Sequence, residues 1–334
     1  MITIYDIAEK CKVSPSTVSK ALNGKNDVSE NTKEEIVRIA HEMGYVSNQI
    51  AKNLITKRTY NIGVLLKDEM FEGYKLGFTH VFFAEILNGF KWNLENRGYD
   101  ISFISNKNAV YGYNYLQNCR AKRFDGIFIL CADFCEAEVQ ELMDYSNPVV
   151  AFDHFDARVS TITSDNEEIY YQMAKHVVSA GYKTLVFCNG GDTDCSVLRR
   201  KGVERAAAEC GIKDLFFRDV QYYSDEEGYA FTKSFLKEKF ERPCIFYPDD
   251  YSALGGIKAA QESGVRFPDE CGLVGCDGTR ILQKFSPRLT TVRQNSYEIG
   301  REAALTLIDR VNGAEKGDSP IVIPAELVFG DTCL

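Results

Sequence analysis

The stretches TIYDIA at residues 3–8 and VSPSTVSKALNG at residues 13–24 decide the fold of the N-terminal part of the chain. Thr3 followed three residues later by Asp6 is the pattern of a capping box, which marks the start of a helix. The apolar residues of this stretch recur at helical spacing and would form one buried face: Ile4, Ile7, Ala8 and Cys11. The first stretch therefore predicts a short amphipathic helix.

A second short helix is predicted directly afterwards. Ser14 is a good N-cap, and Pro15 suits the first turn because the N–H that proline lacks would have no helical partner there. Asn23 and Gly24 are typical of a helix end. Three apolar residues would pack this helix against the first: Val18, Ala21 and Leu22. Because only a short turn separates the helices, the pair is a predicted helix-turn-helix, a motif that binds DNA.

The outward face of the second helix carries short hydroxyl groups and one flexible cation. Such groups are typical of contacts to base edges and phosphates at the start of a recognition helix. The candidate DNA-contacting residues of this region are Thr3, Ser14, Pro15, Ser16, Thr17, Ser19, Lys20 and Asn23. The alternative is a purely structural helix pair, because any small pair capped by Ser and Thr has a similar pattern.

A third helix with one apolar face is predicted to begin after Ser29 and to end at Gly44. The sequence GYVSNQIAKNLI follows at residues 44–55. The order of these pieces resembles the lac-repressor (LacI/GalR) family of bacterial transcription regulators, which opens T-I-x-D-I-A-x-x-x-x-V-S-x-x-T-V-S-x-x-L-N-G and continues G-Y-x-P-N-x-x-A-R-x-L. Ser47 stands where that family has Pro, and Lys52 stands where it has Arg. Lysine keeps the charge of arginine but loses its fork-shaped set of donors.

The resemblance implies that residues 47–59 form a hinge helix and linker, with a helix over residues 48–55 that enters the minor groove of DNA. Leu54 would be the apolar wedge between base pairs. The implied DNA contacts of the hinge are Asn48, Ala51, Lys52, Leu54 and Lys57. Because so short a helix is unstable alone in water, we expect it to form only against a second copy and DNA. The alternative is a plain linker in which Leu54 packs on the larger domain.

Charge is divided unevenly along the 334 residues. Residues 1–59 contain nine Lys/Arg and seven Asp/Glu, whereas the whole chain contains 39 and 48 and has a net charge of −9. Contacts with DNA are therefore expected from the N-terminal part alone. No apolar run is long enough to span a membrane, and the polar N-terminus lacks the core of a signal peptide. The eleven cysteines are scattered, which favours reduced thiols in a cytoplasmic protein over disulfides or zinc ligands.

From residue 61 onward, apolar runs typical of strands alternate with helical stretches. The strands of a first series are predicted near residues 62–66, 101–104, 126–130 and 149–152, and those of a second near 184–188, 215–218, 244–247 and 272–276. Strands this apolar, separated by helices, predict parallel sheets that are covered on both faces. Two such series predict an α/β body of two doubly wound lobes, with a ligand cleft at the carboxyl ends of their strands.

The C-terminal residues extend the resemblance to essentially the whole chain. They comprise TTVRQ at 290–294, a predicted helix at 299–311 and IVIPAELV at 321–328. By that resemblance, the body is similar to periplasmic sugar-binding proteins, in which three strands cross between the lobes. The implied domains are a helix-turn-helix over residues 1–46, the hinge over 47–59 and an effector-binding and dimerisation domain over 60–334. The first lobe is expected to contain about residues 60–160 with 292–320, and the second 161–291 with 321–334.

Polar side chains at strand ends are the candidates for the effector site. Asp153 and Asp277 each follow a predicted strand. Arg199 lies three residues before Gly202, an R-x-x-G pattern that in the family places a guanidinium on the effector. The resemblance adds two aspartates and three aromatic residues: Asp249, Asp250, Phe82, Phe83 and Tyr223. Carboxylates and a guanidinium suit a ligand rich in hydroxyl groups, a sugar or sugar derivative. The alternative for each aspartate is a strand-end or helix-cap role.

No sequence pattern indicates a catalytic or metal site. The chain lacks the G-x-x-x-x-G-K-S/T phosphate loop, a G-x-G-x-x-G after a strand and the G-x-S-x-G nucleophile elbow. Its four histidines, His41, His80, His154 and His176, are isolated. The sequence thus predicts a homodimeric repressor, without a cofactor, that binds pseudo-palindromic operator DNA under the control of a small ligand. The alternatives are an intracellular solute-binding protein without a regulatory role, and an enzyme.

Overall fold

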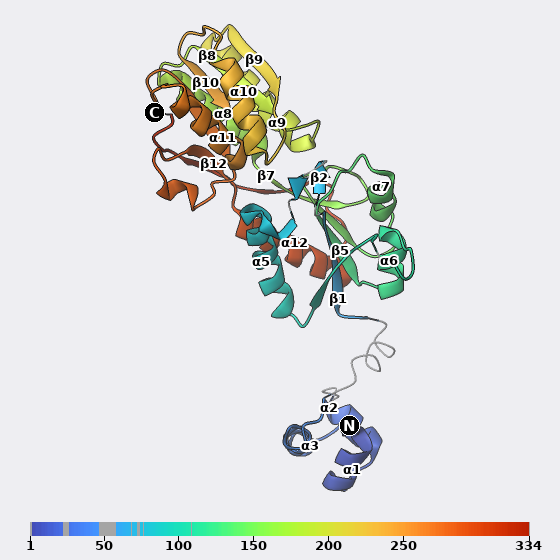
Figure 1. Cartoon of the computed structure of the whole chain (residues 1–334). Helices are drawn as coiled ribbons and strands as arrows, with labels where there is room; N and C mark the ends of the chain where they lie inside the picture. The colour runs from blue at the N-terminus through green and yellow to red at the C-terminus, as the bar shows by residue number, and fades with distance from the viewer. Residues whose placement is uncertain are drawn as a thin grey trace. The chain divides into compact units, whose positions relative to one another are not determined.

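The computed structural model describes residues 2–22, 27–46, 58–67, 69–71, 74–75, 77–107 and 109–333 (Figure 1). The chain divides into two compact units, which we call the head (residues 1–59) and the body (residues 60–334). Each described helix is too short or too polar to cross a lipid bilayer.

The described residues of the head contain three helices: α1 (Ile4–Cys11), α2 (Pro15–Leu22) and α3 (Glu30–Glu42). Thr3 and Asp6 form the predicted capping box at the start of α1. The Ser14 hydroxyl accepts a hydrogen bond from the N–H of Thr17 at 3.0 Å and so caps α2. Buried apolar residues from all three helices form the core: Ile7, Ala8, Val18, Ala21, Val28, Ile36, Ile39 and Ala40. The predicted helix-turn-helix is therefore present, whereas the predicted hinge helix lies outside the described residues.

The first lobe of the body is built around a parallel sheet of six strands in the order β4-β1-β5-β6-β7-β13 (Figure 1). The strands are β1 (Asn61–Leu66), β4 (Asp100–Phe103), β5 (Gly126–Cys131), β6 (Val149–Phe152), β7 (Ser160–Ser164) and β13 (Ile321–Ile323). Two helices cover each face: α5 (Val81–Glu95) and α12 (Ser296–Val311) on one, α6 (Tyr115–Lys122) and α7 (Ala137–Met143) on the other. The central strands β5 and β6 are buried on both faces, which explains why they are apolar throughout.

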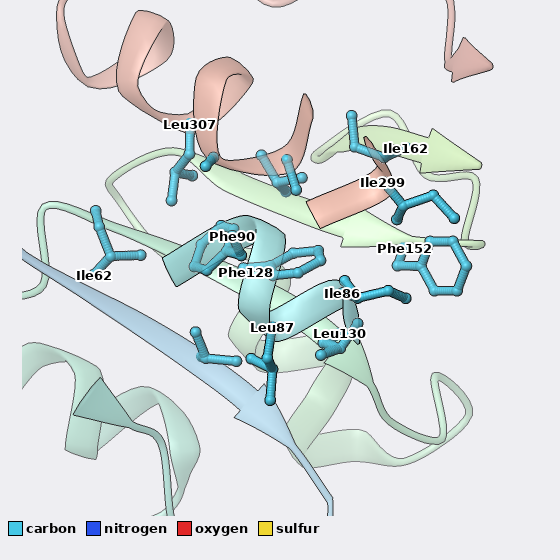
Figure 2. Close-up of a cluster of buried hydrophobic side chains, with 14 of the residues drawn as sticks. Ile62, Ile86, Leu87, Phe90, Phe128, Leu130, Phe152, Ile162, Ile299 and Leu307 are labelled. Atoms are coloured by element: carbon cyan, nitrogen blue, oxygen red, sulfur yellow. The ribbon is translucent and has the colours of Figure 1, made fainter. Parts of the chain in front are cut away.

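Helices α5 and α12 pack on each other as well as on the sheet. Figure 2 shows their side chains in one cluster with the strands, among them Ile86, Phe90, Phe128 and Ile299. A Cβ atom at Gly300 would lie 1.9 Å from the carbonyl oxygen of Ile86, so only glycine permits this approach. The start of α5, where the candidate residues Phe82 and Phe83 lie, is therefore held firmly against the sheet.

The second lobe repeats the architecture around a sheet in the order β14-β12-β11-β10-β8-β9, in which only the β12–β14 pair is antiparallel. The strands are β8 (Thr184–Asn189), β9 (Asp214–Asp219), β10 (Pro243–Phe246), β11 (Gly272–Cys276), β12 (Thr290–Arg293) and β14 (Glu326–Val328). Helices α8 (Asn166–Ser179) and α9 (Asp194–Cys210) cover one face, and α10 (Asp225–Phe235) and α11 (Asp250–Glu262) the other. The predicted class, an α/β body of two doubly wound parallel-sheet lobes, is confirmed.

Three segments of chain connect the lobes: between β7 and α8, between β12 and α12, and between β13 and β14. The predicted lobe boundaries were wrong in detail. Residues 161–164 lie in β7 and residues 321–323 form β13, and these two strands pair with each other in the first sheet. Residues 292 and 293 belong to β12 in the second sheet. Sheet membership depends on pairing between distant segments, which local patterns do not carry.

Four small elements between the main strands and helices were not predicted from the sequence. The short strands β2 (Glu69–Phe71) and β3 (Tyr74–Lys75) pair antiparallel, and single helical turns occupy Gly77–Thr79 and Leu282–Lys284. The first of these turns leads directly into His80 and α5, and therefore sets the entry of the chain into the region where the lobes meet.

Candidate functional site

Two aspartates stand at the carboxyl ends of strands in different lobes. Asp153 follows β6 of the first sheet, and Asp277 follows β11 of the second. Both have positive φ angles, 51° for Asp153 and 107° for Asp277. Residues other than glycine adopt such angles at a cost, and strained backbone of this kind is concentrated at functional sites. These positions are where ligands bind in open α/β sheets.

Arg199 of α9 is held inside the protein between these aspartates and the start of α8. Its side chain is only 4% exposed. Its Nε donates a hydrogen bond to Asn166 Oδ1 at 2.7 Å, and its Nη1 donates one to the carbonyl oxygen of Pro248 at 3.1 Å. The guanidinium also lies 5.4 Å from the ring centre of Tyr170. The guanidinium is therefore fixed in position and direction by groups of the protein itself.

Asp153 is bound to the same network from the first lobe. Its Oδ1 accepts a hydrogen bond from Thr163 Oγ1 at 2.6 Å and a longer one from Asn166 Nδ2 at 3.4 Å. Burial raises the pKa of Asp153 above its ordinary value, and the nearby positive charge of Arg199 opposes that rise. Asp153 and Arg199 thus face each other across the lobes, with Asn166 bonded to both.

Asp277 has one satisfied and one unsatisfied oxygen. Its Oδ1 accepts a hydrogen bond from Gln294 Nε2 at 2.8 Å, whereas its Oδ2 is buried and has no hydrogen-bond partner among the described residues. Burial, reinforced by the carboxylates of Asp250 and Asp249, raises the pKa of Asp277 well above its ordinary value. The carboxyl group is therefore biased toward its protonated form, which can donate as well as accept a hydrogen bond.

The other two predicted aspartates support the protein backbone. Asp249 caps α11: its Oδ1 accepts from the N–H groups of Tyr251 and Ser252 at 2.8 and 2.9 Å, and its Oδ2 accepts from the N–H of Tyr223 at 2.7 Å. Asp250 Oδ1 accepts from Thr291 Oγ1, and its Oδ2 accepts from the N–H of Thr279, both at 2.6 Å. These occupied carboxylates favour the structural alternative, a helix-cap or loop role, over contact with a ligand.

Of the three predicted aromatic residues, one lies in the core of the first lobe and two lie where the lobes meet. Phe82 packs on Phe152, with ring centres 5.9 Å apart, and belongs to the core of the first lobe. Phe83 lies 5.7 Å from Tyr223, which reaches it from the second lobe. The Tyr223 backbone has a φ of 63°, and its N–H bond to Asp249 holds that conformation. Phe83 and Tyr223 therefore form an aromatic contact between the lobes.

Four residues of the site were missed from the sequence: His80, Asn166, Tyr251 and Gln294. Gln294 follows strand β12, so the strand-end rule used for Asp277 could have found it. Asn166 and His80 give no local signal, because their importance arises from contacts with the other lobe. The ring of His80 lies 4.4 Å from that of Tyr223 and 4.8 Å from that of Tyr251.

In the head, the predicted DNA contacts fall into four groups. The side chains of Thr3, Ser14 and Thr17 are engaged in the caps of α1 and α2. Ser16 and Lys20 are exposed, and Lys20 Nζ lies 2.6 Å from Asp27 Oδ2. Pro15 and Ser19 are half-buried. The remaining candidates lie outside the described residues: Asn23, Asn48, Ala51, Lys52, Leu54 and Lys57.

Comparison with known proteins identifies both units. Residues 3–48 match the family model of bacterial regulatory proteins, lacI family, and residues 174–333 match a periplasmic binding protein-like domain. The chain is 29% identical to catabolite control protein A of Priestia megaterium, over 98% of each chain. It is 28% identical to the HTH-type transcriptional repressor PurR of Vibrio parahaemolyticus, over 99% of this chain and 98% of the relative.

The head matches the lacI family of bacterial regulatory proteins, and the whole chain is similar to regulators of that kind.

The fold is also that of solved transcription regulators. It superposes on the Lac repressor dimer bound to operator and the anti-inducer ONPF with a TM-score of 0.81 at 24% identity, over 99% of this chain and 98% of that one. The transcriptional regulator CelR in complex with cellobiose gives a TM-score of 0.71 at 22% identity, over 99% and 100%. The match of residues 3–48 to the lacI family and the two regulators among the relatives indicate a DNA-binding transcriptional regulator, and the periplasmic binding protein-like match indicates a small-molecule effector.

The polar cluster is bonded directly to the segments that connect the lobes. Gln294, which follows β12, donates to Asp277 with its Nε2 and accepts from Ser164 Oγ with its Oε1 at 2.6 Å. The N–H of Asp165 donates to the carbonyl oxygen of Ile323 at 3.1 Å, which joins the first and third connections. A group that binds Asp277 would thus act on the segments that connect the two lobes. Within the described residues, no cluster of His, Cys, Asp and Glu side chains could hold a metal ion.

The raised pKa of Asp277 makes the stability of the body depend on pH. A carboxyl whose pKa is higher in the folded than in the unfolded state contributes its full stability below the unfolded pKa, and this contribution is lost as pH rises toward and through the folded pKa. Asp277→Asn keeps the shape of the side chain without its charge. As pH rises from 4 to 7, the free energy of unfolding of this variant should therefore increase relative to that of the wild type. Urea denaturation at several pH values measures this difference. A constant difference would show that Asp277 ionises normally.

Proposed function

We propose that the protein is a homodimeric transcriptional repressor whose affinity for operator DNA is controlled by a hydroxylated ligand, a sugar or sugar derivative. The ligand binds at Asp153, Arg199 and Asp277. The observation that carries this proposal is the buried, unpartnered Oδ2 of Asp277, on a carboxyl group that is bonded through Gln294 to a connection between the lobes. The repressor PurR among the relatives supports the regulatory role, and the cellobiose complex of CelR supports a sugar.

The chemistry of the cluster suits hydroxyl groups. A hydroxyl both donates and accepts a hydrogen bond, and it can therefore pair with a carboxyl group in either protonation state and with a guanidinium. Asp153 comes from the first lobe, whereas Arg199 and Asp277 come from the second. A ligand with several hydroxyl groups could bond to both lobes at once. Such a ligand would favour one angle between the lobes over others, which is the requirement for control by binding.

The outer surface of the second lobe supports association between two bodies. Leu254 of α11 and Phe285 beyond β11 are 39% and 59% exposed, and they line a hollow of about 360 Å³. Exposed apolar surface around a hollow is typical of a protein interface. We assign this face to a second copy of the chain, because one recognition helix reads only a few base pairs and two heads are needed for a specific operator.

Leu254→Lys should therefore separate the dimer, because it places a charge in an apolar interface. We expect the dissociation constant of the dimer to rise at least about tenfold, with a parallel loss of operator affinity. Analytical ultracentrifugation measures the first and gel shift the second. Val197→Lys, on the exposed part of α9, is the matched control and should change neither quantity. A Leu254→Lys protein that stays dimeric would place the interface elsewhere.

The proposed function is tested by operator selection with the full chain. Random DNA is enriched on the protein, and the enriched sequences should contain a pseudo-palindrome whose binding weakens with salt. Thermal shift against a sugar panel then identifies the ligand, because a ligand that binds the folded state raises the melting temperature. Ligand binding without any sequence-selective DNA binding would instead support the solute-binding alternative.

A further inference from the structure

His80 is a buried polar residue whose side chain makes no hydrogen bond within the described part of the chain. It precedes α5, is 4% exposed, and neither ring nitrogen has a hydrogen-bond partner among the described residues. Burial lowers its pKa to about 4, so the ring is neutral near pH 7 and presents one donor and one acceptor nitrogen. A polar group that is buried without partners destabilises a protein, and it calls for a functional explanation.

The surroundings of His80 are aromatic and come from both lobes. In the first lobe, its ring lies 5.3 Å from that of Phe83. In the second lobe, it lies 4.4 Å from Tyr223 and 4.8 Å from Tyr251. Tyr223 follows β9, and Tyr251 stands in the first turn of α11. His80 is thus a residue of the first lobe that is surrounded by rings of both lobes, and the two nearest rings belong to the second.

The second unpartnered group of the site lies in the same part of the second lobe as these two tyrosines. Asp250, which precedes Tyr251, accepts a hydrogen bond from the N–H of Thr279, two residues after Asp277. The carboxyl group of Asp277 also contributes to raising the pKa of Tyr223 and Tyr251. The unpartnered Oδ2 of Asp277 and the unpartnered nitrogens of His80 therefore occupy one region between the lobes. One lies on each lobe, so a molecule that bonds to both would link the lobes directly.

The charges of this region disfavour an anion. Asp153, Asp249, Asp250 and Asp277 contribute four carboxyl groups, against the single guanidinium of Arg199. The donors Nε and Nη1 of Arg199 are bonded to Asn166 and Pro248. Lys67, which follows β1, is paired with Glu136. Even with some of these carboxyl groups protonated, a phosphate placed here would have, among these residues, only the Arg199 guanidinium, already bonded at Nε and Nη1, to compensate for the loss of its water shell.

We propose that His80 contacts the effector and selects an uncharged, hydroxylated ligand, which bridges His80 of the first lobe and Asp277 of the second. This inference rests on the proposed function and adds a contact residue and a charge class to it. Hydroxyl groups match both ends of the bridge, because each can donate to one partner and accept from the other. The aromatic rings around His80 supply the apolar surface against which the carbon skeleton of such a ligand packs.

The test uses the full chain and matched probes. Glucose, galactose, fructose and ribose are compared with their monophosphates, together with neutral disaccharides, by thermal shift and then by calorimetry. At least one neutral compound should bind, and its phosphate should bind at least about tenfold more weakly. Binding of no neutral compound, or tighter binding of a phosphate, would overturn the inference.

The variant His80→Phe keeps a ring of similar size and removes both nitrogens. Its melting temperature without ligand should equal or exceed that of the wild type, while the dissociation constant of the neutral ligand rises at least about tenfold. His176→Phe is the matched control, because His176 of α8 also has a buried, unpartnered Nε2 and packs on an aromatic ring, that of Phe329 at 4.2 Å. This control should bind the ligand as the wild type does.

The two proposals fail in different ways. A ligand that shifts operator binding but has the same affinity for His80→Phe as for the wild type would overturn the role of His80 and leave the regulatory function in place. Operator binding that no ligand changes would remove the proposed function together with this inference.

Discussion

Replacing Asp277 with alanine should abolish the response of operator binding to the effector while operator binding itself persists. The substitution removes the carboxyl group that we place on the ligand and leaves Gln294 Nε2 without its acceptor. Loss of one hydrogen bond to a buried partner costs about 1–3 kcal/mol, which corresponds to roughly a tenfold to hundredfold loss of ligand affinity. Calorimetry gives the affinity, and fluorescence anisotropy with labelled operator gives the response.

Two further variants separate contact from charge and from general damage. Asp277→Asn retains a group that can donate or accept, so it should keep more ligand affinity than Asp277→Ala. Asp269→Ala removes an exposed carboxyl group from the same lobe and should behave as the wild type. Wild-type ligand affinity in Asp277→Ala would remove this residue from the site.

A second large effect is expected from Leu54→Ala, in the segment outside the described residues. If the hinge places Leu54 as a wedge between base pairs, its loss leaves the cost of unstacking without compensation. Alanine favours a helix at least as well as leucine, so a loss of affinity would not arise from weaker helix propensity. Specific operator affinity should fall severalfold or more, and the bend in the DNA should decrease, with no change in ligand affinity.

Gel shift and circular-permutation bending assays measure these effects. Val37→Ala, on the exposed face of α3 in the same head, is a suitable control because it also shortens an exposed apolar side chain. An unchanged bend with Leu54→Ala would show that this residue packs within the linker, and the wedge mechanism would have to be abandoned.

Much of the fold could be predicted because its signals are local. The capping box of Thr3 and Asp6 and the cap at Ser14 involve residues three positions apart, and both are formed. The alternation of apolar strands and helices likewise predicted two parallel sheets. The assignment of β7 and β13 failed because their pairing joins residues about 160 positions apart, for example Ile162 and Ile321.

The candidate site was predictable by position but not by role. Asp249, Asp250 and Asp277 all follow or precede secondary structure in similar ways, and only the folded contacts distinguish them. The carboxyl oxygens of Asp249 and Asp250 accept hydrogen bonds from backbone N–H groups and threonine, whereas Asp277 retains an oxygen without a hydrogen-bond partner among the described residues. His80 could not be found at all, since its environment is made by Tyr223 and Tyr251, which lie far away in sequence.

The measurement that tests the central claim most directly is the operator affinity of the full chain with and without a saturating ligand. If the ligand controls DNA binding, the dissociation constant of the operator complex should change at least about fivefold, in either direction, when the ligand is added. Because coupling between two sites is reciprocal, the dissociation constant of the ligand should change by the same factor when operator is present. Equal operator affinity in the two conditions, with calorimetry showing that the ligand is bound, would contradict this claim.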